Sequence, residues 1–372
     1  MAGKPLVFIG TYTDPILFGT GAILQGKGEG IHVFRLDTAT GALTPVATNT
    51  GITNPSYLAF DASGRYLYAV NELKTFEGRP SGTVSAFAVD AATGKLTFLN
   101  RQLTHGTDPC HVVVDRRRSH VFVANFMSGS VCVLPVRGDG SLGEASDFVQ
   151  HVGSGIDPAR QKGPHAHAVT LDASERFAFV PDLGLDRLLT YRFDRARGML
   201  EPYTVPWIKM KPGAGPRHLA FHPGGRFAYL VNELDSTVAA LTYDGAGAFA
   251  HLQTVATLPD GSGGASTCAD IQVSPSGAFV YTSNRGHDSI VVHRIDPIAG
   301  TLGYVGHAST LGRTPRSFGI EPSGRFLVAA NQDSDTVVSF RIDPNTGELT
   351  PTGYVAAVPT PVCVKFLAVP RG

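Results

Sequence analysis

The sequence predicts an all-β protein, a seven-bladed β-propeller with four antiparallel strands in each blade. One observation is a repeated hairpin unit, NPSYLAFDASGRYLYAVNE in its first copy, found at 54–72, 108–126, 165–183, 215–233, 267–285 and 314–332. The other is that the copies continue with a third strand-like run, a tight turn and a fourth run, such as GTVSAFAVD followed by GKLTFLN. Four short strands at a period of roughly 50 residues are typical of propeller blades.

The two ends of the chain together supply the seventh blade. Residues 360–369 repeat only the first strand, whereas 5–13 match a second strand, 30–37 a third and 41–50 a fourth. We therefore expect both termini to close the last blade, which leaves no open sheet edge. On this interpretation residues 1–372 form one domain. A pair of β-sandwiches is the alternative fold, and the regular repeat disfavours it.

The unit is clearest at 215–235, GPRHLAFHPGGRFAYLVNELD. Leu219–Phe221 and Phe227–Val231 are short apolar runs, and the Gly and Pro residues of 222–225 predict a turn between them. A hairpin brings its two ends side by side, so Arg217 and Glu233 are expected to meet at the end opposite the turn.

The composition is that of a compact protein without a nucleic-acid or membrane-surface partner. Hydrophobic residues make up 42% and charged residues 17%, and 31 Lys+Arg balance 31 Asp+Glu. No apolar run reaches the roughly 18 residues of a membrane helix, and the start lacks the features of a signal peptide. The scattered cysteines predict free thiols in a reducing compartment: Cys110, Cys132, Cys268 and Cys363. We expect a cytoplasmic monomer or weak homo-oligomer; export to the periplasm by an unrecognised signal is the alternative.

The loops differ in length at the two ends of the predicted ring. First-to-second and third-to-fourth connections are tight turns, such as DASG and DPNTG. Those at the other end are long, at 13–29, 73–81, 151–163 and 206–215. Because binding sites are usually built from loops held on a rigid scaffold, the long-loop end is the expected functional face. The alternative is that these loops only cap the ring.

Comparison between the copies of a repeat separates structural residues, which recur in every copy, from residues that only one copy holds. One position holds Asn or Asp in every full copy, namely Asn71, Asn125, Asp182, Asn232, Asn284 and Asn331. Side chains of these types hydrogen-bond local backbone, so we interpret the set as caps of strand ends rather than a metal cage. No metal or other cofactor is therefore expected.

Two other positions vary from blade to blade at the long-loop end. The position of Arg217 holds in turn Ser56, Cys110, His167, Arg217, Ala269, Arg316 and Val362. The position of Glu233 holds Glu72, Phe126, Leu183, Glu233, Arg285 and Gln332, with Thr11 from the N-terminal strand. Because first strands line a propeller channel, the polar members are expected to converge at one mouth. An anion site with acid/base groups fits them better than the alternative, a salt-bridge network that plugs the channel.

The neighbours of these positions receive lesser roles. His165 precedes His167 by two residues, so both point the same way if the segment is a strand. His111 and His218 are expected to pack between blades, and Cys110 has no neighbour that predicts a nucleophile. The candidates for substrate binding are His165, Arg316, Glu72, Gln332 and Asp182.

Several motifs give the chain a family resemblance. They include IGTYT at 9–13, GPHAHAV at 163–169, PDLGLDR at 181–187, SNRGHDSI at 283–290 and the hairpins at 54–72 and 215–234. With these motifs, which span nearly the whole chain, it resembles the seven-bladed propeller lactonase family. That family includes propeller-type bacterial 6-phosphogluconolactonase and the fungal carboxymuconate cycloisomerase. The resemblance implies a metal-independent site and places the catalytic residues at His167, Arg217, Glu233 and Arg285.

We therefore expect a carboxylic-ester hydrolase that opens a small anionic sugar-acid lactone, most directly 6-phosphogluconolactone to 6-phosphogluconate in the pentose phosphate pathway. In this interpretation His167 is the general base and Glu233 the alternative base. Arg217 and Arg285 stabilise the oxyanion or bind the anionic group of the substrate, and Arg316 holds a phosphate from across the channel. A lactonizing cycloisomerase and a propeller that only binds a partner protein are the competing functions.

Overall fold

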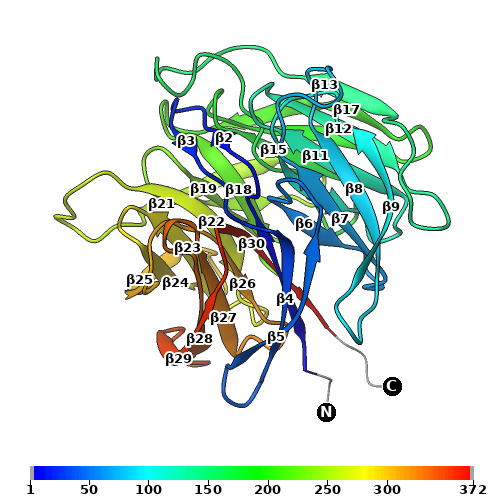
Figure 1. The fold of residues 1–372 in the computed structure, drawn as a ribbon. Helices are drawn as coiled ribbons and strands as arrows, with labels where there is room; N and C mark the ends of the chain where they lie inside the picture. Colours follow the sequence, from blue (N-terminus) through cyan, green and yellow to red (C-terminus); the bar gives the residue numbers. More distant parts are fainter. Residues whose placement is uncertain (1–3, 369–372) are drawn as a thin grey trace.

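In the computed structural model, which describes residues 4–368, the chain forms seven four-stranded antiparallel sheets and one two-stranded ribbon (Figure 1). The ribbon is formed by β2 (Ile16–Leu17) and β3 (Ile23–Leu24). Blades 1 to 3 consist of β6 (Leu58–Phe60), β7 (Tyr66–Asn71), β8 (Thr83–Val89) and β9 (Leu96–Leu103); β10 (Pro109–Val114), β11 (His120–Asn125), β12 (Ser130–Pro135) and β13 (Asp147–Gln150); and β14 (Thr170–Leu171), β15 (Phe177–Asp182), β16 (Arg187–Asp194) and β17 (Met199–Lys209).

Blades 4 to 6 follow in the same order along the chain. They consist of β18 (Pro216–Phe221), β19 (Phe227–Asn232), β20 (Thr237–Tyr243) and β21 (Phe249–Ala256); β22 (Thr267–Val273), β23 (Phe279–Arg285), β24 (Ser289–Ile295) and β25 (Leu302–Ser309); and β26 (Pro315–Ile320), β27 (Phe326–Asn331), β28 (Thr336–Ile342) and β29 (Leu349–Ala357). A single 3₁₀ turn, Gln332–Ser334, is the only helical element within residues 4–368. None of the described helical structure has the length and apolar character that crossing a bilayer requires.

Both ends of the chain build blade 7, as the sequence predicts. Its strand order is β30 (Pro361–Leu367), β1 (Leu6–Thr11), β4 (Gly30–Leu36) and β5 (Leu43–Thr50). The C-terminal strand pairs with the N-terminal one, for example Val364 with Ile9. In Figure 1 the red strand β30 accordingly lies beside the blue start of the chain. The seven-bladed propeller with a blade closed by both termini is confirmed.

Packing between blades explains why the second strands are so apolar. Every residue of β19 is buried, and the same holds for β11, β15 and β27. These strands are covered on both faces because each blade packs against two neighbours; Tyr229 and Val231, for example, pack with Cys268 of the next blade. The fourth strands lie at the outside of the ring, and β21 contains only partly buried and exposed residues. The apolar core therefore lies between the blades and leaves the centre of the ring to other side chains.

The first strands contain a β-bulge that turns two successive residues toward the channel. In blade 4 the pairing shifts between Pro216 and His218, which leaves Arg217 unpaired. A bulge re-aims side chains in this way, and the shift recurs at Cys110 and Arg316. The prediction that His111 and His218 pack between blades is wrong for this reason, since both line a cavity of the channel.

The repeated Asn/Asp position acts as the sequence predicts. Each of these side chains is buried, and each ties the end of a second strand to nearby chain. The Nδ2 groups of Asn71, Asn284 and Asn331 donate to the carbonyls of Thr53, Thr257 and Thr310 at 2.7, 2.9 and 3.0 Å. Asn125 donates to the Thr104 carbonyl and Asp182 accepts from the His165 N–H, whereas Asn232 donates only to the Thr237 hydroxyl. The interpretation as caps is confirmed for the five side chains that contact backbone.

Two local predictions are wrong. The segment around His165 and His167 is not a strand, because blade 3 starts its first strand only at Thr170 and Ala166 forms an isolated bridge. The two histidines therefore do not share one direction. The stretch 206–209, predicted as part of a loop, extends the outer strand β17, where Trp207 pairs with Leu189.

Candidate active site

A cavity of about 360 Å³ opens at the long-loop end of the channel. The loop between β1 and β4 roofs one side with residues 16–20, and the loop after β13 contributes Arg160. Most of the residues expected to converge here line this cavity: His167, Glu233, Arg285, Arg316, Glu72 and Gln332. Arg217 lies below it and lines a smaller space at its floor.

Glu233 is the centre of a buried cluster of charges. Its Oε2 accepts a hydrogen bond from Nε of Arg217 at 3.0 Å and forms an ion pair with Nη2 of Arg285 at 2.9 Å. Its Oε1 accepts a hydrogen bond from Nη2 of Arg160 at 2.7 Å. Burial raises the pKa of a carboxyl, but the three arginines outweigh it and hold the pKa of Glu233 far below its ordinary value. Glu233 is therefore an ionised anchor for the arginines.

A second chain of contacts fixes Arg217 from the other side. Its Nη1 donates to Nε2 of His218 at 3.1 Å and to the carbonyl of Ala269. Because Nε2 of His218 accepts, its Nδ1 carries the ring proton and donates to Oδ1 of Asp270 at 3.0 Å. Burial, together with the charge of Arg217, lowers the pKa of His218 to about 4. The guanidinium is thus held between a carboxylate and a neutral imidazole.

His167 is buried, and its surroundings decide which ring nitrogen is basic. The Cys110 thiol lies 3.3 Å from the carbonyl of His167, to which it donates, and 3.6 Å from Nδ1 of the ring. A thiol that donates to the carbonyl fits a proton on Nδ1, facing the sulfur, and a lone pair on Nε2, and we assign this tautomer. Burial and the charge of Arg217 lower the pKa of His167 well below its ordinary value. The imidazole is therefore neutral and able to accept a proton.

Cys110 itself is protonated, because burial raises the pKa of its thiol. A neutral thiol is a poor nucleophile. This agrees with the expectation that Cys110 is not one.

Arg316 and Glu72 form the opposite wall. The Arg316 guanidinium carbon lies 5.5 Å from the centre of the Tyr12 ring and 5.4 Å from that of Phe18. Among residues 4–368 it has no hydrogen-bond partner, so its N–H groups remain available to a ligand. Glu72 accepts a hydrogen bond from the Tyr12 hydroxyl at 3.0 Å, and burial raises its pKa.

The floor of the site holds a space of about 10 Å³, lined by Ser56, Glu72, His167, Arg217 and Arg316 among others. A single water needs about 10–15 Å³ and two to four polar partners. The Ser56 hydroxyl is buried without a hydrogen-bond partner within the described residues. Size and chemistry therefore suit one water next to His167.

Two predicted substrate-binding residues do not reach the cavity. Asp182 is fully buried, and its carboxylate is occupied by Nδ1 of His151 at 2.6 Å and the backbone N–H of His165 at 2.7 Å. The His165 ring stacks on Phe126 with ring centres 4.7 Å apart and lies outside the cavity lining. Both assignments are corrected: Asp182 caps its blade, and His165 supports Phe126.

Three residues of the site are missing from the sequence prediction. Arg160 lies in a long loop with no equivalent in other blades, and Tyr12, in the IGTYT segment, directly follows the N-terminal strand β1. Asp108 lines the cavity directly before the Pro109 that opens β10. Comparison of the blades could have found Asp108, because it is a carboxylate at a position where most other blades hold Asn, Gly or Thr before the equivalent proline.

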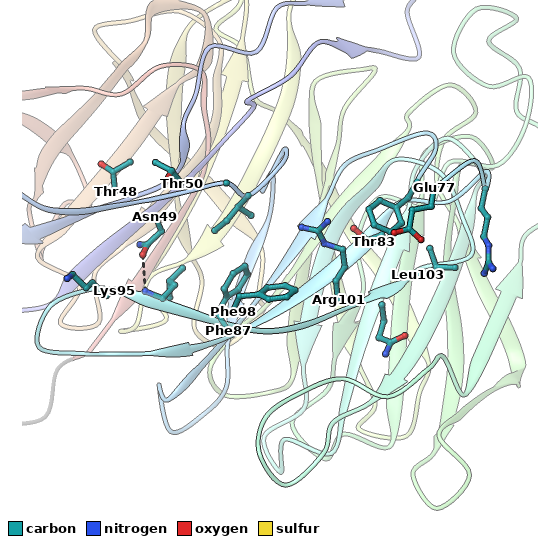
Figure 2. Close-up of a pocket in the computed structure, with 16 residues that line it drawn as sticks. Thr48, Asn49, Thr50, Glu77, Thr83, Phe87, Lys95, Phe98, Arg101 and Leu103 are labelled. Atoms are coloured by element: carbon teal, nitrogen blue, oxygen red, sulfur yellow. Dashed lines mark hydrogen bonds between the residues drawn. The ribbon is translucent and has the colours of Figure 1, made fainter.

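Other cavities differ from this one in their chemistry. The opposite end of the channel holds one of about 390 Å³, where Nζ of Lys365 donates to the Tyr57 hydroxyl at 3.0 Å. A larger groove of about 870 Å³ lies outside the ring between β5 and β9 (Figure 2). There the guanidinium carbon of Arg101 lies 5.9 Å from the ring centre of the exposed Phe98. No histidine or cysteine stands among the described residues that line the groove, so it lacks the combination of histidine, carboxylates and buried arginines found at the channel mouth.

Comparison with known proteins agrees with this geometry. The family model for lactonase, 7-bladed beta-propeller, matches residues 6–366. The chain is 39% identical over 365 residues to a 6-phosphogluconolactonase of Bacillus subtilis, covering 98% of this chain and 99% of that one. It is 34% identical over 319 residues to a 6-phosphogluconolactonase of Formosa agariphila, covering 84% and 86%.

A solved structure, the periplasmic gluconolactonase of Pseudomonas aeruginosa, superposes with a TM-score of 0.90 at 34% identity and covers 99% of this chain and 100% of that one. The match over nearly the whole length includes the strands and loops that build the cavity. The chain belongs to the seven-bladed β-propeller lactonase family.

Proposed function

We propose that this lactonase hydrolyses a phosphorylated sugar-acid lactone, most directly 6-phosphogluconolactone, at the mouth of its channel. The observation that carries the proposal is the neutral His167 beside buried arginines and a water-sized space. The names of the Bacillus and Formosa relatives support the substrate. The free guanidinium of Arg316 supplies a contact for its phosphate.

The first step is attack by water. A water in the floor space loses a proton to Nε2 of His167 as its oxygen bonds to the lactone carbonyl carbon. Glu233 is a poor base because its pKa is held far below the ordinary value by Arg285, Arg217 and Arg160. The sequence left both residues as candidates for the general base, and we assign this role to His167.

The oxyanion that forms is stabilised by cations already in place. Arg285 lines the cavity and Arg217 its floor, and Glu233 holds both guanidinium groups in fixed positions. Donors positioned in advance stabilise developing charge without reorganisation during the reaction. Glu233 is therefore a positioning residue, and the two arginines are catalytic.

A direct assay tests the reaction. The protein is mixed with 6-phosphogluconolactone, with unphosphorylated gluconolactone and with a muconolactone, and acid release is followed against the spontaneous rate in excess EDTA. We expect opening of the sugar lactones and full activity in the chelator, because the proposed steps use only side chains. Failure with every sugar lactone would refute the proposal, conversion of the muconolactone alone would favour a cycloisomerase, and loss of activity restored by calcium would contradict the metal-free mechanism.

Replacement of Arg316 tests the phosphate contact. Arg316→Ala removes a charge-assisted hydrogen bond worth about 1.5–3 kcal/mol, so KM for 6-phosphogluconolactone should rise roughly 10- to 100-fold with little change in kcat. KM for unphosphorylated gluconolactone should stay nearly constant. Arg65→Ala, an exposed arginine in a turn of the opposite face, is the matched control. Equal effects on the two lactones would contradict phosphate recognition by Arg316.

A further inference from the structure

The cavity contains one carboxyl group without a partner. Glu233 is bound by three arginines, Glu72 accepts from Tyr12, and Asp333 accepts from Nε2 of Gln332 at 2.8 Å. The carboxylate of Asp108, which lines the same cavity, makes no hydrogen bond with any residue of the range 4–368. Its Oδ2 is fully buried, and the whole residue is 3% exposed. A buried polar group in this state needs an explanation, and a catalytic role is one that the cavity makes available.

The backbone holds Asp108 in a fixed place. Its N–H donates to the carbonyl of Leu73 and its carbonyl accepts from the N–H of Phe126, both at 2.9 Å. Two residues further along, Cys110 contacts the His167 ring. The side chain is therefore anchored between blades 1 and 2 on the wall that leads to His167.

The repeat provides an internal comparison for this position. In four other blades the residue before the equivalent proline also has a positive φ. The values are 41° for Asn54, 65° for Gly215, 57° for Thr314 and 40° for Thr360, against 52° for Asp108. Asn54 Oδ1 accepts from the backbone N–H of Thr13 at 2.8 Å, and the Thr360 hydroxyl donates to the carbonyl of Tyr12 at 2.7 Å. Gly215 shows that the turn forms without any side chain. The fold therefore does not require a carboxyl here, and that of Asp108 is free for chemistry.

We propose that Asp108 is the proton donor for ring opening, an inference that rests on the proposed lactone hydrolysis. After water has added and its proton has passed to His167, the bond from the former carbonyl carbon to the ring oxygen breaks. The ring oxygen takes the proton of the Asp108 carboxyl and becomes the hydroxyl of the open-chain acid. Transfer of the proton on His167 to the Asp108 carboxylate through solvent restores both groups.

The electrostatic surroundings suit a donor near neutral pH. Burial, with a smaller contribution from Glu72, raises the pKa of Asp108 to about 7, and Lys74 opposes the shift. The other ionisable groups that face it across the cavity or along its strand are Cys110, Arg160, His167, Glu233, Arg285, Arg316 and Asp333. An acid whose pKa lies near the working pH is the most effective donor.

The test uses Asp108→Asn in the full-length protein. Asparagine adopts positive φ readily and stands at this turn in blade 1, so the variant should fold, which its thermal unfolding checks. In the active wild type, kcat/KM should fall as pH rises through about 7, because the donor form is lost. In Asp108→Asn, kcat/KM should be about a hundredfold lower at pH 6 and should not fall as pH rises through about 7. Asp235→Asn is the control, because burial also raises the pKa of Asp235 but its side chain lies outside the cavity lining.

Infrared spectra give a readout without substrate. The wild type should lose carboxylic-acid absorbance between pH 6 and pH 8, and this loss should be missing in Asp108→Asn. The role of Asp108 alone would be overturned if the wild type opens the lactone and Asp108→Asn shows a normal rate or the same pH profile. A wild type that opens no sugar lactone would overturn the proposed function itself, whatever the spectra show.

Discussion

His167→Ala should lower kcat by about 10²–10⁴, the range typical of general acid–base catalysis. In the proposed mechanism the residue accepts the proton of the attacking water at Nε2, because the other ionisable groups beside the floor space are cations or already have hydrogen-bond partners. Glu72 already accepts from the Tyr12 hydroxyl. Both ring nitrogens of His218 are engaged, by Arg217 and by Asp270. Arg217 and Arg316 are cations. The equivalent position of blade 5 holds Ala269, so the fold should tolerate alanine. Steady-state kinetics and thermal unfolding of the variant test both statements.

The pH profile sharpens this test. Because burial and Arg217 lower the pKa of His167 well below its ordinary value, the imidazole stays neutral through the range where a free histidine takes up a proton. Wild-type kcat/KM should therefore show no loss on the acid side near pH 6.5. His251→Ala, in the outer strand β21 and exposed, is the control. An acid-side loss near 6.5 that vanishes in His167→Ala would contradict the neutral base, and a normal kcat would show that the base lies elsewhere.

The comparison between blades predicted the composition of the cavity well. It required only that the first strands line the channel, and His167, Arg316 and Arg285 do line one cavity at its mouth. The β-bulges of the first strands were not visible in the sequence, because an extra residue in a strand leaves no change in its apolar run. His111 and His218 were therefore assigned to the wrong side, although His218 holds Arg217 in place.

Residues outside the repeat could not be found by comparing its copies. Arg160 comes from a loop that has no counterpart in other blades, and its contact with Glu233 depends on how that loop folds over the mouth. Asp182 lies inside the repeat but could not be assigned from it, since an aspartate can either cap a strand or bind substrate. Only the short contact with His151 and full burial distinguish the two roles.

Glu233→Gln should lower the free energy of unfolding by about 3–5 kcal/mol, the usual cost of breaking a buried ion pair from one side. The neutral amide leaves Arg217, 3% exposed, beside Arg285 without the carboxylate that compensates both. Activity should fall as well, because these guanidinium groups lose their fixed positions. Urea denaturation measures the loss, and Glu201→Gln is the matched control. Glu201 also binds two arginines, Arg192 and Arg197, but at the surface, where such pairs contribute about 1 kcal/mol or less.

The pH dependence of this loss in the free energy of unfolding tests whether it comes from the charge of Glu233. The folded-state pKa of Glu233 lies far below that of the unfolded chain, so its contribution to stability is complete above the unfolded value of about 4.3 and declines as pH falls below it. The wild type should lose this contribution in acid, whereas Glu233→Gln has none to lose. The difference between the two proteins should therefore be largest at neutral pH and shrink below pH 4. A difference that stays constant into acid would mean that the amide fails for reasons of packing, and the ionised carboxylate would no longer be the group that holds the arginines together.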